Sequence, residues 1–174
     1  LVNIVYKDIG MINLGNTCYI NSCLQILIHC PLFIYKFFNL HSIIKIDEKP
    51  ISFHLFKICV VMMNTVNTQE TCIDIEHFKN AFGMKHPIFQ GYTQNDSQEF
   101  CRVLLEDISS ELNEIKYKPL YKELTNNDNK TKIIRDKEFD HNFKERENSI
   151  ITDLFYSQII TTFTCQCKAE TYSF

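Results

Sequence analysis

The sequence predicts an α+β fold in which helices dominate and the clearest strand lies near the end of the chain. Apolar residues recur at helical spacing after Cys18 and again after Asp96. A further apolar run, FHLFKICVVMM, covers residues 53–63 and is typical of a buried helix. Residues 159–165 instead alternate between two sets of side chains, which predicts a β-strand.

Length and composition indicate a folded globular protein. The 174 residues suffice for one domain with a real core, and 45% hydrophobic with 22% charged residues argues against disorder. A net charge of −3 gives no reason to expect nucleic acid or an acidic membrane as a partner. The longest apolar stretch, residues 19–38, contains several polar side chains and Pro31, so we expect a core helix there rather than a membrane span.

The eight cysteines predict free thiols rather than disulfides. No signal-peptide pattern opens the chain, and several cysteines lie inside apolar helical runs. We therefore expect a cytoplasmic or nuclear protein. Because the chain begins at Leu1 without methionine, we also expect it to be part of a longer protein.

The stretch from Gly10 to Gln25, GMINLGNTCYINSCLQ, is predicted to hold a nucleophile. Residues 13–16 include residue types that tolerate tight turns and positive φ, and Thr17 is a plausible N-cap for the helix that follows. Cys18 then falls in the first turn, where open amide groups and the helix dipole favour a thiolate and lower the thiol pKa. The plain alternative is a small buried residue, which is the usual role of a free cysteine.

The same stretch resembles the cysteine box of the ubiquitin-specific proteases, a family of papain-like deubiquitinating enzymes. The box has the form G-L-x-N-L-G-N-T-C-Y-M-N-S-x-L-Q, and Met11 and Ile20 are conservative departures from it. The resemblance implies a papain-like cysteine protease with Cys18 as nucleophile and Asn13 as a stabiliser of the oxyanion. It also implies ubiquitin or ubiquitinated proteins as partners, and no cofactor for the reaction.

A second stretch, GYTQNDSQEFCRVLL over residues 91–105, predicts a capped amphipathic helix. Asp96 and Glu99 have the spacing of a capping-box variant, and an apolar stripe starts at Phe100. That account needs no function. Yet the stretch also resembles the family's second box, G-Y-x-Q-Q-D-A/S-x-E-F, with Asn95 as the one departure. The resemblance implies that Asp96, with Glu99 beside it, binds the basic C-terminal tail of ubiquitin.

Between these two boxes, a short helix is predicted after the apolar run of residues 53–63. Residues 74–82 have helical character, with Asp74 as the expected N-cap and Gly83 as the expected C-terminal stop.

The last third of the chain divides into a polar part and an ordered part. Residues 116–148 are rich in Asn and mixed charges, which predicts a solvated loop or insert. Residues 149–174 resemble the family segment that leads into the fingers subdomain. Many members carry a C-x-x-C zinc knuckle there, whereas Cys165 and Cys167 are one residue closer and supply half a tetrahedral set. A structural zinc in complete fingers and cysteines without metal both stay open.

The resemblance covers only the front part of the family's catalytic domain. Residues 1–115 correspond to the helical thumb, 116–148 to the insert, and 149–174 to the first strands of the fingers. None of the six histidines has the G-H-Y context of the family's histidine box. The six are His29, His41, His54, His77, His86 and His141. We therefore expect a fragment with little activity alone, which needs the downstream half of the domain. The alternative is a catalytically silent ubiquitin-binding or scaffold module of the same fold.

Overall fold

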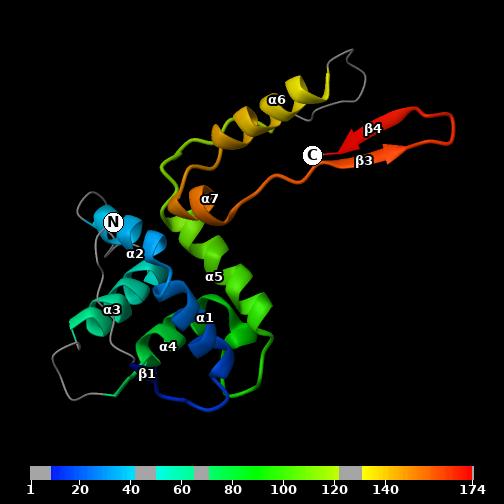
Figure 1. Cartoon of the computed structure of the whole chain (residues 1–174). Helices are drawn as coiled ribbons and strands as arrows, with labels where there is room; N and C mark the ends of the chain where they lie inside the picture. The colour runs from blue at the N-terminus through cyan, green and yellow to red at the C-terminus, as the bar shows by residue number, and fades with distance from the viewer. Residues whose placement is uncertain (1–8, 42–49, 65–70, 122–130, 174) are drawn as a thin grey trace. The chain divides into compact units, whose positions relative to one another are not determined.

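The computed structural model describes residues 9–41, 50–64, 71–121 and 131–173. The chain divides into two compact units, Leu1–Leu112 and Asn113–Phe174. In Figure 1 the first unit runs from blue to green and the second continues to red. All four residues predicted for catalysis and substrate binding belong to the first unit.

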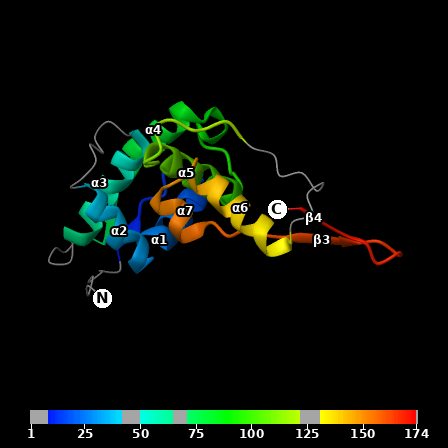
Figure 2. The same cartoon turned by 90° about the horizontal axis from the view of Figure 1, so that it is seen from above.

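Helices make up most of the described part of the first unit. In chain order they are α1 (Cys18–Ile28), α2 (Pro31–His41), α3 (Pro50–Asn64), α4 (Glu76–Lys85), the 3-10 helix η3 (Pro87–Phe89) and α5 (Ser97–Glu111). Helix α1 packs against α5 and α2, and α3 packs against α4, α5 and α2. Figure 1 shows α1 beside α5, and Figure 2 shows α2 beside α3. The helix that begins at Cys18 is therefore central to this unit.

The long apolar stretch forms two helices rather than the single core helix that the sequence predicted. Helix α1 ends at Ile28, and Pro31 opens α2, because proline lacks an amide N–H and fits the first turn of a helix. Both helices bury apolar side chains in the core. No described helix is by itself long and apolar enough to cross a membrane. The two helices Cys18–Ile28 and Pro31–Leu40, which meet at an angle of 82°, would together be long and apolar enough by length and composition alone.

A cluster of aromatic rings fixes the start of α1 against α4, η3 and α5. Phe82 lies at the centre, with ring centroids 5.8 Å from Phe78, 5.4 Å from Phe89 and 4.9 Å from Phe100. Tyr19, the residue after Cys18, meets Phe100 edge to face at 5.4 Å. All five rings are buried. Burial of such rings stabilises a fold by several kcal/mol, so the first turn of α1 is firmly held.

Helix α4 differs from its prediction at both ends. It begins at Glu76, with Ile75 in the N-cap position. Asp74 lies one residue before the N-cap and accepts a hydrogen bond of 2.7 Å from the Glu76 amide. Gly83 lies inside the helix and does not end it. A Cβ at Gly83 would lie 3.3 Å from the Gln90 Cα, so the glycine serves close packing rather than helix termination.

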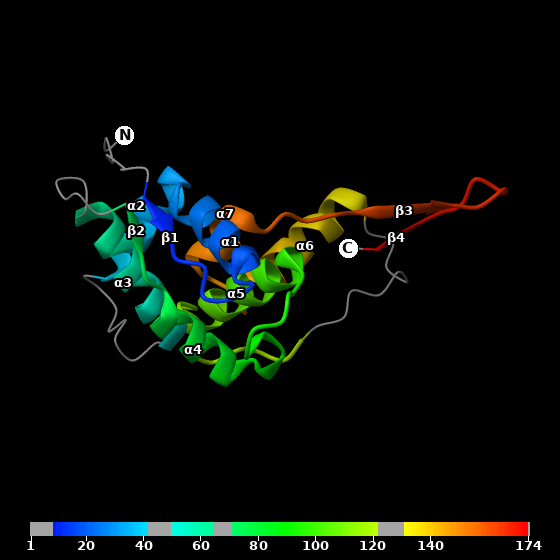
Figure 3. The ribbon, with the colours of Figure 1, turned by 90° about the horizontal axis from the view of Figure 1, so that it is seen from below.

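A two-stranded parallel sheet holds the segment that leads into the predicted nucleophile. Strand β1 (Gly10–Met11) pairs with β2 (Cys72–Ile73), with Gly10 opposite Cys72. Figure 3 shows the two strands side by side. The Ile12 amide adds a hydrogen bond of 2.9 Å to the Ile73 carbonyl. The chain is therefore fixed on both sides of residues 13–17, by this sheet before them and by α1 after them.

The second unit contains a helix where the sequence predicted a loop. Helix α6 (Lys132–Lys144) lies within the polar segment 116–148, of which residues 122–130 fall outside the described part. The expectation of a loop rested on charge, but residues 132–144 contain no Gly or Pro. Exposed pairs also support the helix at i,i+4 spacing, with 2.8 Å between Lys144 and Asp140 and 3.4 Å between His141 and Glu145.

The second unit continues with a capped helix and a hairpin. Helix α7 (Ile150–Phe155) starts at a reciprocal capping box between Ser149 and Thr152. Strand β3 (Thr161–Thr164) then pairs antiparallel with β4 (Glu170–Ser173), with Thr161 opposite Ser173. The predicted strand within residues 159–165 is thus confirmed.

Candidate active site

The loop before α1 is built around the side chain of Asn13. Gly15 and Asn16 both have positive φ, at 92° and 54°, as the sequence predicted for this turn. The Asn13 Oδ1 atom accepts from the Gly15 amide at 3.1 Å, the Thr17 amide at 3.2 Å and the Thr17 hydroxyl at 3.3 Å. Among the residues that the structure describes, no acceptor meets the Asn13 Nδ2. The exposed side chain thus keeps its donor for an external acceptor.

Thr17 occupies the predicted N-cap position but does not cap the helix. Its hydroxyl accepts from the Leu14 amide at 3.0 Å and donates to Asn13, so it closes the loop instead. Within the described chain, no side-chain hydrogen bond caps the start of α1. The first-turn amides beside Cys18 therefore stay available to an anion.

Cys18 differs from the other described cysteines of the helical core in its exposure. It is the first residue of α1 and its side chain is exposed. Burial raises the pKa of the Cys23 thiol to about 11, with the neighbouring Cys101 as a second cause. Cys59 is completely buried, and this burial raises its thiol pKa. Cys23 and Cys59 therefore stay protonated at neutral pH, whereas Cys18 lies where a substrate could reach it.

Tyr19 joins the start of α1 to the start of α5. Its ring is buried in the aromatic cluster, and its hydroxyl accepts a hydrogen bond of 3.3 Å from Asn95 Nδ2. Burial raises the pKa of the Tyr19 hydroxyl, while the bond from Asn95 opposes that shift. This contact places the second predicted stretch beside the first. No sequence signal pointed to it, because Asn95 stood out only as a departure from the family box.

Asp96 caps α5, as predicted, with only one of its carboxylate oxygens. Its Oδ1 accepts from the Gln98 amide at 2.7 Å and the Glu99 amide at 3.0 Å. The reciprocal half of a capping box, from Glu99 back to the Asp96 amide, is not formed in the described structure. Both side chains are exposed, so Asp96 Oδ2 and the Glu99 carboxylate face solvent near the start of α5.

The histidines whose side chains the structure describes supply no partner for Cys18, because no hydrogen bond joins its sulfur to any of their rings. His86 is instead bonded through Nε2 to Asp107 Oδ2 at 2.7 Å, with Lys85 at 2.8 Å from the other oxygen of that carboxylate. Its ring packs against Phe82 with centroids 4.8 Å apart. His86 lies at the C-cap of α4, and its hydrogen bond to Asp107 links α4 to α5.

Cys165 and Cys167 lie in the turn between β3 and β4. Both are exposed, and hydrogen bonding from the Cys167 backbone is the main cause that lowers the pKa of the Cys165 thiol. Among the described residues, no group of three His, Cys, Asp or Glu side chains is arranged to hold a metal. The two thiols could supply two of the four ligands of a structural zinc, so the other two would have to come from elsewhere.

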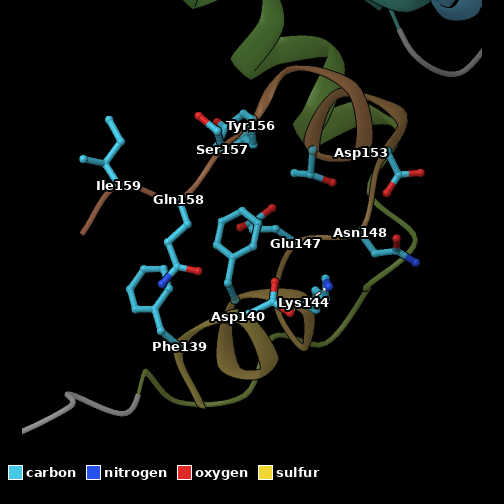
Figure 4. A pocket seen from close by; sticks show the side chains of 12 residues that line it. Phe139, Asp140, Lys144, Glu147, Asn148, Asp153, Tyr156, Ser157, Gln158 and Ile159 are labelled. Carbon is cyan, nitrogen blue, oxygen red and sulfur yellow. Dashed lines mark hydrogen bonds and ion pairs between the residues drawn. The ribbon is translucent and has the colours of Figure 1, made fainter. Parts of the chain in front are cut away.

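A cavity of about 830 Å³ lies in the second unit. Figure 4 shows its lining, which comes from α6, α7, the segment that joins these two helices and the segment that follows α7. Its acidic side chains include Asp140, paired with Lys144, and Glu147, paired with Lys118. None of the residues predicted for catalysis or substrate binding lines it, so it is not the candidate site.

The chain belongs to the ubiquitin carboxyl-terminal hydrolase family, whose model matches residues 9–171. This is the family of cysteine hydrolases that the helical fold and the loop before Cys18 indicated. We call this loop, residues 13–17, the nucleophile loop. The helix-rich α+β fold of a partial papain-like domain is therefore confirmed.

Particular relatives resemble nearly the whole of this chain. It is 30% identical to ubiquitin carboxyl-terminal hydrolase 12 of Saccharomyces cerevisiae, over 95% of this chain and 14% of that protein. It is also 30% identical to ubiquitin carboxyl-terminal hydrolase 10 of Arabidopsis thaliana, over 90% of this chain and 17% of that protein. The chain thus spans less than a fifth of the length of these relatives.

Solved structures of the SAGA DUB module resemble the fold. The module of Ubp8, Sgf11, Sus1 and Sgf73 bound to ubiquitin aldehyde matches with a TM-score of 0.50 and 29% identity, over 59% of this chain and 24% of that one. The same module with a cysteine-to-alanine variant of Ubp8, bound to monoubiquitin, matches with a TM-score of 0.51 and 26% identity. That match covers 63% of this chain and 27% of the other chain.

Proposed function

We propose that this chain forms the nucleophile-bearing part of a thiol-dependent deubiquitinase, which hydrolyses the isopeptide or peptide bond at the C-terminal glycine of ubiquitin. The observation that carries the proposal is the exposed Cys18 at the uncapped start of α1, directly after the loop organised by Asn13. Membership of the ubiquitin carboxyl-terminal hydrolase family and the ubiquitin-bound relatives support this substrate.

The proposed reaction proceeds through an acyl-enzyme. The Cys18 thiolate attacks the carbonyl carbon of the terminal glycine, and its electron pair forms the new C–S bond while the carbonyl oxygen becomes an oxyanion. Collapse of this tetrahedral intermediate expels the amine, which takes up a proton, and leaves a thioester. Water then hydrolyses the thioester, releases the ubiquitin carboxylate and restores Cys18. No cofactor takes part in these steps.

Two donors of this chain are suited to the oxyanion. Asn13 Nδ2 has no acceptor among the described residues, because the loop uses only the carbonyl oxygen of that amide. The Cys18 amide lies in the first turn of α1, which no side chain caps within the described structure. Donors that are fixed before the reaction stabilise developing charge without further reorganisation, so both would lower the barrier to attack.

Asp96 and Glu99 are proposed to bind the basic tail of ubiquitin. The cap of α5 uses Asp96 Oδ1, which leaves Oδ2 for a charge-assisted contact with a cationic side chain. Glu99 lies in the first turn of the same helix and is exposed. One carboxylate can thus both hold its helix and bind substrate.

We further propose that the general base is a histidine outside these 174 residues. The small share of each relative that the chain spans supports this, as does the absence, among the described side chains, of a hydrogen bond between a histidine ring and Cys18. The isolated chain would then hydrolyse ubiquitin conjugates poorly, and the downstream part of the domain would restore activity. A cytoplasmic or nuclear location is proposed with it, since the mechanism needs a reduced thiol.

A ubiquitin derivative with a C-terminal electrophile tests the assignment in the full-length protein. We expect the probe to label Cys18, and Cys18→Ala to abolish labelling. Cys23→Ala is the matched control and should label normally, because that thiol is protonated at neutral pH. Label on Cys23 or another thiol would contradict the assignment. Tight ubiquitin binding without labelling would instead support the silent binding module.

A further inference from the structure

The nucleophile loop takes part in a contact between three segments that are distant in sequence. They are the loop itself at Gly15 and Asn16, the segment before α5 at Tyr92, and α4 at Lys79. All three belong to the first unit. Their contact does not involve the sulfur of Cys18 or the amide of Asn13, so the mechanism above leaves it without a role.

The Tyr92 ring lies directly against Gly15. A Cβ built on Gly15 would come within 2.7 Å of Tyr92 Cδ1, closer than two carbon atoms can approach. Gly15 also has a φ of 92°, which other residues rarely adopt. The loop is therefore seated on this ring, and only glycine fits at the point of contact.

Asn16 fixes the same contact through the backbone. Its Nδ2 atom donates a hydrogen bond of 2.9 Å to the Tyr92 carbonyl oxygen, across 76 positions of sequence. Asn16 has a φ of 54°, and asparagine adopts that conformation more readily than most residues. One residue of the loop thus meets the Tyr92 ring, and the next meets the Tyr92 backbone.

Lys79 holds the ring from α4. Its ammonium nitrogen lies 4.5 Å from the centroid of the Tyr92 ring, which is a cation–π contact. Lys79 is only 8% exposed, whereas Tyr92 is 71% exposed. A ring this exposed would otherwise change rotamer readily, so the cation restrains it.

We infer that Tyr92 is a positioning residue for the deubiquitinase reaction, with Lys79 restraining its ring and Asn16 tying its backbone to the loop. The inference rests on the proposed function. The loop carries Asn13 at one end and leads into Cys18 at the other. The packing of the loop against Tyr92 therefore sets the distance between the oxyanion donor and the nucleophile. A misplacement of about 1 Å at a reacting centre can cost about a hundredfold in rate.

Steady-state cleavage of a ubiquitin fluorophore conjugate by the full-length protein tests this inference. In Tyr92→Ala we expect kcat to fall by about tenfold to a hundredfold while KM stays nearly unchanged, because the loop loses its seat but the substrate contacts remain. Tyr92→Phe should restore kcat, since the ring and backbone carbonyl persist. Tyr117→Ala, which truncates a tyrosine that is 93% exposed, is the matched control and should behave as wild type.

Two further variants keep the test decisive if Tyr92→Ala is poorly folded. Asn16→Gly preserves access to positive φ and removes the donor, and Lys79→Met keeps an apolar stem and removes the cation. Both should lower kcat more than they raise KM. A rise in KM at constant kcat would make Tyr92 a substrate contact and overturn the inference, as would unchanged kinetics. If the wild-type protein neither cleaves the conjugate nor is labelled by the ubiquitin electrophile, the proposed function is overturned as well. If the wild type is active and the variants have unchanged kinetics, only this inference is overturned.

Discussion

Replacing Asp96 by Asn separates its structural role from its proposed role in binding ubiquitin. The Oδ1 atom of Asp96 makes both cap bonds, at 2.7 Å to the Gln98 amide and 3.0 Å to the Glu99 amide. An asparagine Oδ1 can keep both, and asparagine caps helices about as well as aspartate. The lost helix-dipole contribution of an exposed charge is about 0.3–1 kcal/mol, so the melting temperature should change little.

Substrate binding should respond much more strongly to the same change. Asp96→Asn turns Oδ2 from an anionic acceptor into an amide donor, which cannot pair with a cationic side chain. A hydrogen bond to a charged group contributes about 1.5–3 kcal/mol. At about 1.4 kcal/mol per decade, kcat/KM for ubiquitin substrates should fall by about tenfold to a hundredfold.

The assay compares thermal melting and cleavage of a ubiquitin fluorophore conjugate in the full-length protein. Asp74→Asn is the matched control, because Asp74 is also exposed and also accepts from an amide at a helix start, at 2.7 Å from Glu76 N. That variant should keep kcat/KM. Unchanged cleavage in Asp96→Asn would leave Asp96 as a cap alone, and an equal loss in Asp74→Asn would refute a specific contact.

Two further expectations concern the oxyanion donor and the thiols. Asn13→Ala should lower kcat by about 10²–10³ with little change in KM. Asn13→Asp keeps the acceptor that organises the loop, so it should also lower kcat but reduce the melting temperature less than Asn13→Ala does. A rise in KM without a fall in kcat would contradict the role of Asn13 as oxyanion donor. In alkylation by a small electrophile at neutral pH, Cys23 should react slowly, because raising its pKa from 9.0 to about 11 cuts the thiolate fraction about a hundredfold. Cys165, whose pKa is lowered, should react much earlier by mass spectrometry, and comparable rates would contradict both shifts.

The local features of the candidate site could be predicted from the sequence because they depend on short-range chemistry. Positive φ at Gly15 and Asn16, the helix start at Cys18 and the cap at Asp96 all follow from residue types at fixed offsets. The hydroxyl of Thr17 was the exception. Its position was right, but its partner was wrong, since the loop competes with the helix for the same hydroxyl.

The long-range contacts could not be predicted from one sequence. Nothing local indicates that Asn95 meets Tyr19, or that Tyr92 seats the nucleophile loop, because these contacts depend on how α1 and α5 pack. Helix α6 was missed for a different reason. Its mixed charges look like a loop in composition, and only their i,i+4 pairing on a helical backbone makes them favourable.

The close packing at Gly83 limits how this protein could be made more heat-resistant. Replacing a mid-helix glycine by alanine is a common stabilising change, with a propensity gain of about 1 kcal/mol. Here the added methyl group would lie 3.3 Å from the Gln90 Cα, two residues before Tyr92. Gly83→Ala would therefore need the backbone at Gln90 to move by a few tenths of an ångström, in the segment that continues to Tyr92, so a change made for helix stability would also act on the residue that contacts the nucleophile loop.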